Sequence, residues 1–103
     1  MVTRVVIWTE TAIRQRRHTF EYWNDRNKSK AYSRRLQAAI RERIDHLKAH
    51  PEMGRETELE GIRVISLGHY SIIYRSEKER ILILAFWDNR RDPKKLLQSI
   101  NEA

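Results

Sequence analysis

The sequence predicts an α+β fold with one antiparallel sheet. The expected order is an N-terminal strand, an antiparallel helical hairpin, a three-stranded meander that completes the sheet, and a short C-terminal helix. Two observations carry this prediction. Apolar residues recur every three or four positions between residues 32 and 47, which is the period of a helix. Three β-rich segments separated by short turns then follow between residues 62 and 86. With 103 residues, the chain is expected to form a single domain, residues 1–103.

The N-terminal strand is predicted at Thr3 to Trp8, because the segment TRVVIW is rich in β-branched and aromatic residues. Thr9 follows the strand and is the expected N-cap of a first helix. That helix runs from Glu10 to about Asp25, since its apolar positions fall near one helical face: Ala12, Ile13, Phe20 and Trp23.

The second helix has the clearest amphipathic pattern in the chain. Ser29 is its expected N-cap, after a polar break. The apolar positions that follow are spaced by 4, 4, 4 and 3 residues: Tyr32, Leu36, Ile40, Ile44 and Leu47. The helix should end near His50, because Pro51 disfavours helical geometry in the residue before it. Two helices joined by so short a break are expected to form an antiparallel hairpin.

Three strands are expected after an acidic loop. The loop spans Pro51 to Glu60 and holds four glutamates and one arginine. The first two strands are Ile62–Leu67 and Tyr70–Ser76, with turns at residues 68–69 and 77–79. The connections are so short that neighbouring strands of this meander can only be antiparallel. The N-terminal strand is expected to join the same antiparallel sheet.

The last strand, Ile81 to Phe86, is a run of six apolar residues, with Trp87 at its end. Such a run is typical of a strand covered on both faces, whereas a helical hairpin covers only one face of a sheet. Asp92 and Pro93 supply a helix start. The C-terminal helix should have its apolar side at Leu96, Leu97 and Ile100. This side either docks on the sheet or stays exposed until a partner binds it.

The charge of the chain is concentrated in its first half. Residues 1–50 hold 12 Lys or Arg and 5 Asp or Glu, whereas residues 51–103 hold 9 of each, so the net charge of +7 arises before residue 51. Such a concentration of positive charge favours nucleic acid, the ribosome or an acidic protein segment as partner. The alternative is a solvated basic face that only keeps the protein soluble. The basic positions around the hairpin lie near Trp23 and Tyr32, which either pack between the helices or stack on nucleic acid.

Composition also limits the setting and the chemistry. The chain has no cysteine, which excludes disulfides and thiolate metal sites. It has neither an apolar run long enough to span a bilayer nor a signal-peptide pattern at its start, so we expect a cytoplasmic protein without membrane contact. His46 and His50 lie four residues apart, but no carboxylate or further ligand accompanies them. We therefore expect no metal and no cofactor.

Four short motifs, taken in order, resemble one family. They are P-x-x-G-R at residues 51–55, E-L-x-G-I-R at residues 58–63, Y-x-I-x-Y at residues 70–74 and R-R-D-P at residues 90–93. Together with the order of elements, they resemble the RelE/ParE superfamily of type II toxins over essentially the whole chain. The resemblance implies a small basic bacterial toxin, neutralised by a cognate acidic antitoxin protein and touching DNA only indirectly, through that antitoxin. The RelE branch cleaves mRNA in the ribosomal A site, and the ParE branch inhibits DNA gyrase.

The ribonuclease pattern is only partly present. Attack by a ribose 2′-hydroxyl needs a proton acceptor and cations around the phosphate. Compared with the RelE branch, Arg63 and Arg91 stand at expected basic positions, and His69 lies in a nearby turn. Three other positions depart from the pattern: Ile65, Ser71 and Leu97. If the protein is an enzyme, it is a metal-independent mRNA endoribonuclease that uses Arg63, His69 and Arg91.

The favoured hypothesis is a ParE-like toxin that arrests growth by binding a target such as DNA gyrase. The R-R-D-P turn resembles the R-Q-D-P segment of ParE-like sequences. The expected target-binding residues are basic: Arg63, Arg90, Arg91, Lys94 and Lys95. In the structural alternative, Asp92 and Pro93 only start a helix, and Arg90 pairs either with Asp88 or with a backbone carbonyl at the C-terminal end of the last strand. A third hypothesis is a degenerate, non-toxic binding module.

Overall fold

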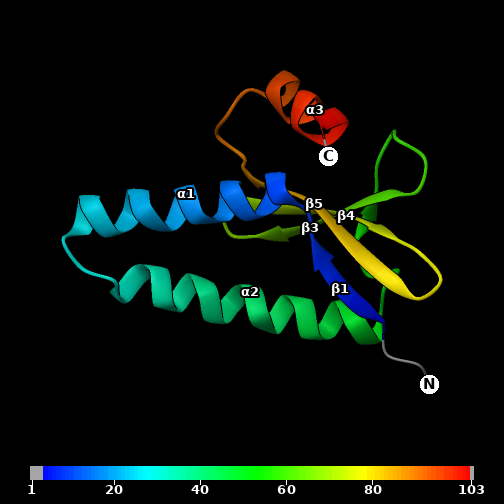
Figure 1. The fold of residues 1–103 in the computed structure, drawn as a ribbon, viewed down its shortest axis with the longest axis horizontal. Helices are drawn as coiled ribbons and strands as arrows, with labels where there is room; N and C mark the ends of the chain where they lie inside the picture. Colours follow the sequence, from blue (N-terminus) through cyan, green and yellow to red (C-terminus); the bar gives the residue numbers. More distant parts are fainter. Residues whose placement is uncertain (1–3, 103) are drawn as a thin grey trace.

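The computed structural model describes residues 4–102, so Thr3 of the predicted first strand lies outside the described residues. The predicted order of the major elements is confirmed (Figure 1). Along the chain, the elements are β1 (Val5–Trp8), α1 (Glu10–Asn27), α2 (Ala31–Ala49), β2 (Arg55–Glu56), β3 (Ile62–Leu67), β4 (Tyr70–Ser76), β5 (Arg80–Asp88) and α3 (Pro93–Glu102). The predicted loop at residues 51–60 therefore contains the two-residue strand β2.

The strands form one mixed sheet in the order β1-β5-β4-β3-β2. The meander is antiparallel as predicted, but β1 runs parallel to β5, with Val5 beside Arg80 and Trp8 beside Ile83. The prediction that β1 joins an antiparallel sheet is therefore wrong. Short turns dictate direction only between consecutive strands. The direction of β1 depends instead on how the intervening helical hairpin packs, which no local pattern specifies.

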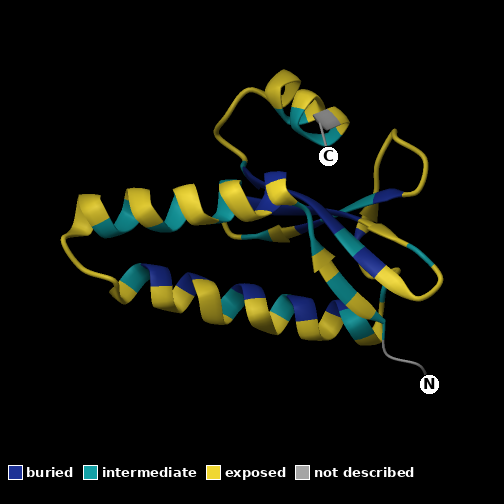
Figure 2. Ribbon diagram, in the orientation of Figure 1, coloured by how far each residue is buried: buried dark blue, intermediate teal, exposed yellow. Residues whose placement is uncertain are grey.

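The helical hairpin covers one face of the sheet, as Figure 2 shows by the buried stripe along α2. Thr9 is the N-cap of α1, and its Oγ1 accepts a hydrogen bond from the Ala12 backbone N–H at 3.2 Å. For α2 the prediction was off by one residue: Lys30 holds the N-cap position, while the Ser29 hydroxyl accepts from the Ala31 N–H. Apolar residues from both helices and the sheet form this core: Ala12, Leu36, Ile40, Ile44, Leu47, Ile65, Tyr70, Ile72, Tyr74, Ile81, Ile83 and Phe86.

The helix α3 docks on the opposite face of the sheet (Figure 1). Leu96 and Ile100 pack against a second cluster made by the sheet: Ile62, Ile73, Leu84, Ala85 and Trp87. Both faces of β5 are therefore covered, as its apolar run predicted, and Trp87 belongs to the strand and to this cluster. The placement of Leu97 on the apolar side is wrong, since it is 50% exposed. Leu96 and Ile100 are one helical turn apart, whereas Leu97 points about 100° away from Leu96.

Candidate functional site

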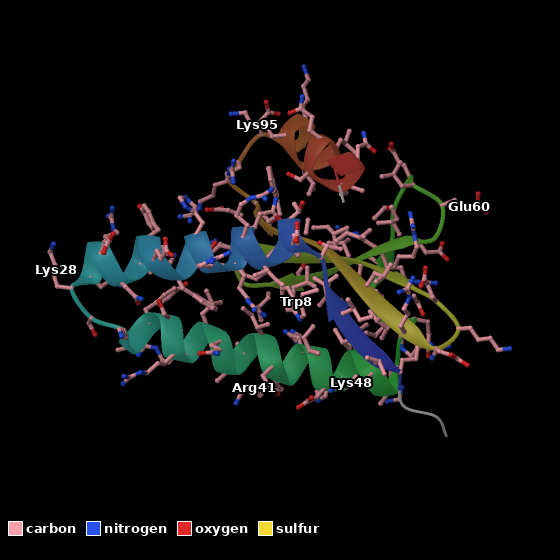
Figure 3. The ribbon with its side chains drawn as sticks, viewed as in Figure 1. Trp8, Lys28, Arg41, Lys48, Glu60 and Lys95 are labelled. Carbon is pink, nitrogen blue, oxygen red and sulfur yellow. The ribbon has the colours of Figure 1, made fainter. Side chains whose placement is uncertain are left out.

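A groove of about 720 Å³ opens between α1, the ends of β4 and β5, and α3. Side chains from all these elements meet there although they lie far apart in sequence. Figure 3 shows one of them, Lys95, at the start of α3 where the chain arrives from β5. The lining residues are Arg14, Gln15, His18, Thr19, Tyr22, Trp23, Tyr70, Phe86, Trp87, Asp88, Arg90, Arg91, Lys95, Gln98 and Ser99.

The turn after β5 is held by Arg90 and Asp88. The Arg90 guanidinium donates twice to the Asp88 carboxylate, at 2.9 and 2.8 Å, and the Arg90 backbone N–H donates to it at 2.9 Å. These hydrogen bonds from Arg90 lower the pKa of Asp88, and Asp88 in turn raises the pKa of Arg90. Of the two partners expected for Arg90 in the structural alternative, Asp88 is the one observed, and it largely offsets the charge of Arg90.

Two further hydrogen bonds tie this turn to β4 and to the turn between β3 and β4. Ser71 is 9% exposed, and its hydroxyl donates to Asn89 Oδ1 at 2.6 Å. The Asn89 backbone N–H donates to the His69 carbonyl oxygen at 2.8 Å. Ser71, which departs from the ribonuclease pattern, therefore anchors the loop that carries the arginines. The exposed His69 is not among the residues that line the groove.

Arg91 extends the cationic surface into the groove. Its guanidinium carbon lies 4.6 Å from the centre of the Trp87 ring, a cation–π geometry. Its backbone N–H donates to the Asp88 carbonyl oxygen at 3.0 Å. Trp87 itself is only 3% exposed, so the ring is a fixed support. Among the side chains of residues 4–101, no carboxylate lies within ion-pairing distance of Arg91.

The α1 wall of the groove includes residues that the sequence did not assign to a site. Arg14, His18 and Tyr22 are spaced by four residues, so they lie along one side of α1. This spacing is visible in the sequence, but nothing in the sequence indicates that this side of α1 faces α3. The position of α1 on the sheet is what makes these side chains part of the groove.

Gln15 joins the three elements that form the groove. Its Oε1 accepts the backbone N–H of Phe86 at 2.9 Å, and its Nε2 donates to Ser99 Oγ on α3 at 3.1 Å. The pairing of β1 with β5 ends at Trp8 and Ile83, so beyond that point no strand of the sheet lies beside β5 on this side. A side-chain amide satisfies the free N–H instead, as a buried backbone donor requires. Gln15 thereby fixes α3 against α1.

The floor of the groove is aromatic and already hydrogen-bonded. Trp23 Nε1 donates to the Tyr70 hydroxyl at 2.7 Å, and the Tyr70 ring stacks on Phe86 with 5.1 Å between ring centres. Trp23 also packs against Tyr32 at 4.8 Å, which confirms that these aromatics pack between the helices. Burial raises the pKa of Tyr70, so its phenol stays neutral.

Comparison with known families identifies the chain. The family described as the ParE toxin of type II toxin-antitoxin systems, parDE, matches residues 6–93. The chain belongs to the ParE toxin family. This confirms the predicted ParE-like branch of the RelE/ParE superfamily, and it makes the protein the toxin of a type II system whose partner is a cognate antitoxin. None of the curated proteins matches the chain.

A solved structure shares the fold of this ParE-family toxin. A chain of the structure titled "Chromosomal ParDE TA system from P. aeruginosa" is 20% identical, with a TM-score of 0.69. The match covers 82% of the toxin and 94% of that chain. No helix among residues 4–102 of the toxin combines the length and apolar character that crossing a membrane requires.

Arg63 lies away from the groove of the toxin. Along the sheet, Arg63 pairs with Tyr74, whereas the groove begins where Tyr70 pairs with Asp88. These positions are four residues apart along β4, about 13 Å at the rise of a strand. Of the expected target-binding residues, the structure brings Arg90, Arg91 and Lys95 together in the groove, while Arg63 and Lys94 are not in its lining.

Arg63 instead holds the loop that contains the P-x-x-G-R motif. Its guanidinium donates to the Gly54 carbonyl oxygen at 2.7 Å and to Glu56 Oε1 at 3.2 Å. The Tyr74 hydroxyl donates to the Pro51 carbonyl oxygen at 2.7 Å and accepts the Gly54 N–H at 2.9 Å. A Cβ at position 54 would lie 2.5 Å from that hydroxyl, which explains the glycine. This family motif therefore has a structural role.

The charged side chains that line the groove are mainly cationic. Its described lining holds four Lys or Arg side chains and one carboxylate, and Arg90 already engages that carboxylate. Ile65, where the ribonuclease pattern has a lysine, is buried under the helical hairpin. Among the described residues, no three His, Asp or Glu side chains are grouped as metal ligands.

Proposed function

We propose that this ParE-family toxin arrests growth in the cytoplasm by binding DNA gyrase. The observation that supports the proposal best is the charge of the groove: in its described lining, four cations outnumber one carboxylate, which Arg90 engages. The proposed contact surface is the turn after β5 with the start of α3: Arg90, Arg91, Lys94 and Lys95. A preformed cationic surface of this kind favours fast, oriented association with an acidic partner.

Binding is favoured over RNA cleavage because Arg63, one of the three residues proposed for cleavage, lies away from the other two. The Arg63 side chain is hydrogen-bonded to the loop at residues 51–56. Arg63 also pairs with Tyr74, four residues along β4 from Tyr70, where the groove that contains Arg91 begins. His69 is outside the groove lining. General acid–base catalysis needs its groups within hydrogen-bond reach of one reacting site. The three residues Arg63, His69 and Arg91 do not form such a set in this arrangement.

A supercoiling assay with purified toxin and gyrase tests the proposal. We expect inhibition that rises with toxin concentration and is lost in Arg91→Ala, whose circular dichroism should match the wild type. Arg34→Ala is the matched control, because Arg34 is an exposed arginine on α2 outside the groove. Unchanged supercoiling at excess toxin would refute the gyrase target. Codon-positioned mRNA cuts after induction would then favour the endonuclease, and harmless overexpression without the antitoxin would favour the non-toxic module.

We further propose that the antitoxin contributes an acidic, amphipathic segment that covers apolar surface left open by the helices. Val5 and Ile7 on the outer strand β1 are 62% and 40% exposed. Arg4 precedes Val5 in the chain, and Arg80 on β5 is the sheet partner of Val5. Such a surface suits an acidic segment with apolar anchors. The dissociation constant of the toxin–antitoxin complex should therefore rise between low and high salt, and an unchanged value would contradict the electrostatic part of this proposal.

A further inference from the structure

The charges in the groove between α1 and α3 come from three separate elements and face one space. We propose that this groove receives an acidic segment of the toxin's protein target, with carboxylates of the target paired to Arg14, Arg91 and Lys95. The inference rests on the proposed function, in which the toxin acts by binding a protein. It goes beyond that function because it places the contact in the groove, adds α1 to the contact surface, and names the chemistry of the bound segment.

The three cations are unpaired within the described part of the chain. Ion pairs among the side chains of residues 4–101 involve other basic residues: Lys48, Arg63, Arg80 and Arg90. Asp88, the one carboxylate among the described residues of the groove lining, is held by Arg90. The field of the remaining cations is therefore not cancelled locally. Fields from like charges add inside a concave surface, so the groove should attract carboxylates more strongly than an isolated lysine does.

The groove holds the Arg91 side chain and the helix that carries Lys95 in position before a partner arrives. Arg91 rests on the buried Trp87 ring, and its backbone is tied to Asp88. The helix that carries Lys95 is linked through Ser99 to Gln15 on α1. Fewer rotatable groups therefore have to be ordered when the acidic segment binds, which lowers the entropic cost of association.

The aromatic residues of the groove favour a protein segment over single-stranded nucleic acid. Nucleic-acid grooves stack bases on exposed aromatic faces. Here Tyr70 and Trp87 are each 3% exposed, and Arg91 already covers the Trp87 ring. Tyr22, which is 49% exposed, is the only large exposed hydrophobic residue in the described lining. The exposed chemistry of the groove is thus mainly cationic, which suits carboxylates.

A matched pair of charge reversals on α1 tests the inference. Arg14 lines the groove, whereas Arg17 is an exposed arginine on the same helix outside the lining. A second pair uses Lys95 at the start of α3 and Lys28 at the far tip of the helical hairpin (Figure 3). Each variant changes the net charge equally, so a difference within a pair measures position rather than total charge.

The measurements are the dissociation constants for purified gyrase and for a labelled, short poly-glutamate peptide. We expect Arg14→Glu and Lys95→Glu to weaken both by about tenfold or more, which is about 1.4 kcal/mol. Arg17→Glu and Lys28→Glu should change both by less than about twofold. Circular dichroism and thermal unfolding verify the fold of each variant. If a charge reversal unfolds, Arg14→Gln and Lys95→Gln replace it, with Arg17→Gln and Lys28→Gln as controls.

The inference and the proposed function fail in distinguishable ways. If wild-type toxin does not bind gyrase but the peptide still distinguishes groove variants from controls, the gyrase target is wrong and the acidic-segment groove stands. If gyrase binds but both members of each pair weaken binding equally, the target stands and the groove assignment is overturned. A single-stranded oligonucleotide that binds more tightly than the peptide, with the same difference between variants, would also overturn it in favour of nucleic acid.

Discussion

Replacing Tyr74 with phenylalanine removes a single oxygen atom from the centre of the molecule. Tyr74 is completely buried, and its hydroxyl bridges two backbone groups of the loop at residues 51–54. In Tyr74→Phe, the Gly54 N–H and the Pro51 carbonyl oxygen both lose their partner. Leaving a buried polar group unsatisfied costs about 1–3 kcal/mol. We therefore expect the free energy of unfolding to fall by about 2 kcal/mol, because the loop relaxes enough for water to reach one of the two groups.

Urea denaturation followed by tryptophan fluorescence measures this change. The slope of the free energy against urea concentration should stay constant while the midpoint falls. The thermal midpoint should fall by roughly 10 °C for a domain of this size. Tyr32→Phe is the matched control, since no hydrogen bond of the Tyr32 hydroxyl occurs within the described structure, and its cost should stay below about 0.5 kcal/mol. Equal stability of the two variants would refute the reasoning.

Four further predictions concern the same loop and the groove. Gly54→Ala should lower the free energy of unfolding by about 1–3 kcal/mol, because the new Cβ would overlap the buried Tyr74 ring. Gly61→Ala is the control: nothing lies within 4 Å of its Cβ, so the only destabilisation should come from the strained positive φ. Urea midpoints measure both variants. Arg63→Ala should lower the free energy of unfolding by about 1 kcal/mol in the same assay, while the folded protein still inhibits gyrase. Lost inhibition with unchanged stability would contradict the structural role of Arg63. Burial raises the pKa of Tyr74 above its unfolded value, so the neutral phenol favours the folded state. The free energy of unfolding should therefore fall as the pH rises above about 10, and it should fall less steeply in Tyr74→Phe. Equal slopes of stability against pH in the two proteins would count against this. Gln15→Ala should speed hydrogen exchange in α3 more than in α2, and uniform exchange rates would show that α3 docks without it.

Local patterns were sufficient for the helices and for the meander. The spacing of Leu36, Ile40 and Ile44 predicts which face of α2 is buried, because a helix repeats every 3.6 residues whatever it packs against. The turns between β3, β4 and β5 are too short for any arrangement except antiparallel neighbours. The apolar run in β5 predicted cover on both faces, and the docking of α3 supplied the second layer.

The candidate site was predicted less completely than the fold. The sequence predicted a basic turn at residues 88–92. It also indicated an ion pair between Arg90 and Asp88, which are two residues apart. Arg63 carries a family motif as well as a positive charge, and the sequence does not reveal which of these reflects its role. Its contact with Gly54 shows that the motif residue holds a loop. Charge and motif therefore identified candidate residues without placing them in one site.

By itself, the sequence determined the major helices and strands, the family and the basic character of this toxin, because these follow from spacing, composition and motifs along the chain. Only the tertiary structure decided the direction of β1 and the meeting of Arg14 with Lys95, which are far apart in sequence. Both depend on how the helical hairpin and α3 pack on opposite faces of the sheet. Packing is settled by the joint fit of all buried side chains, so no local segment encodes it.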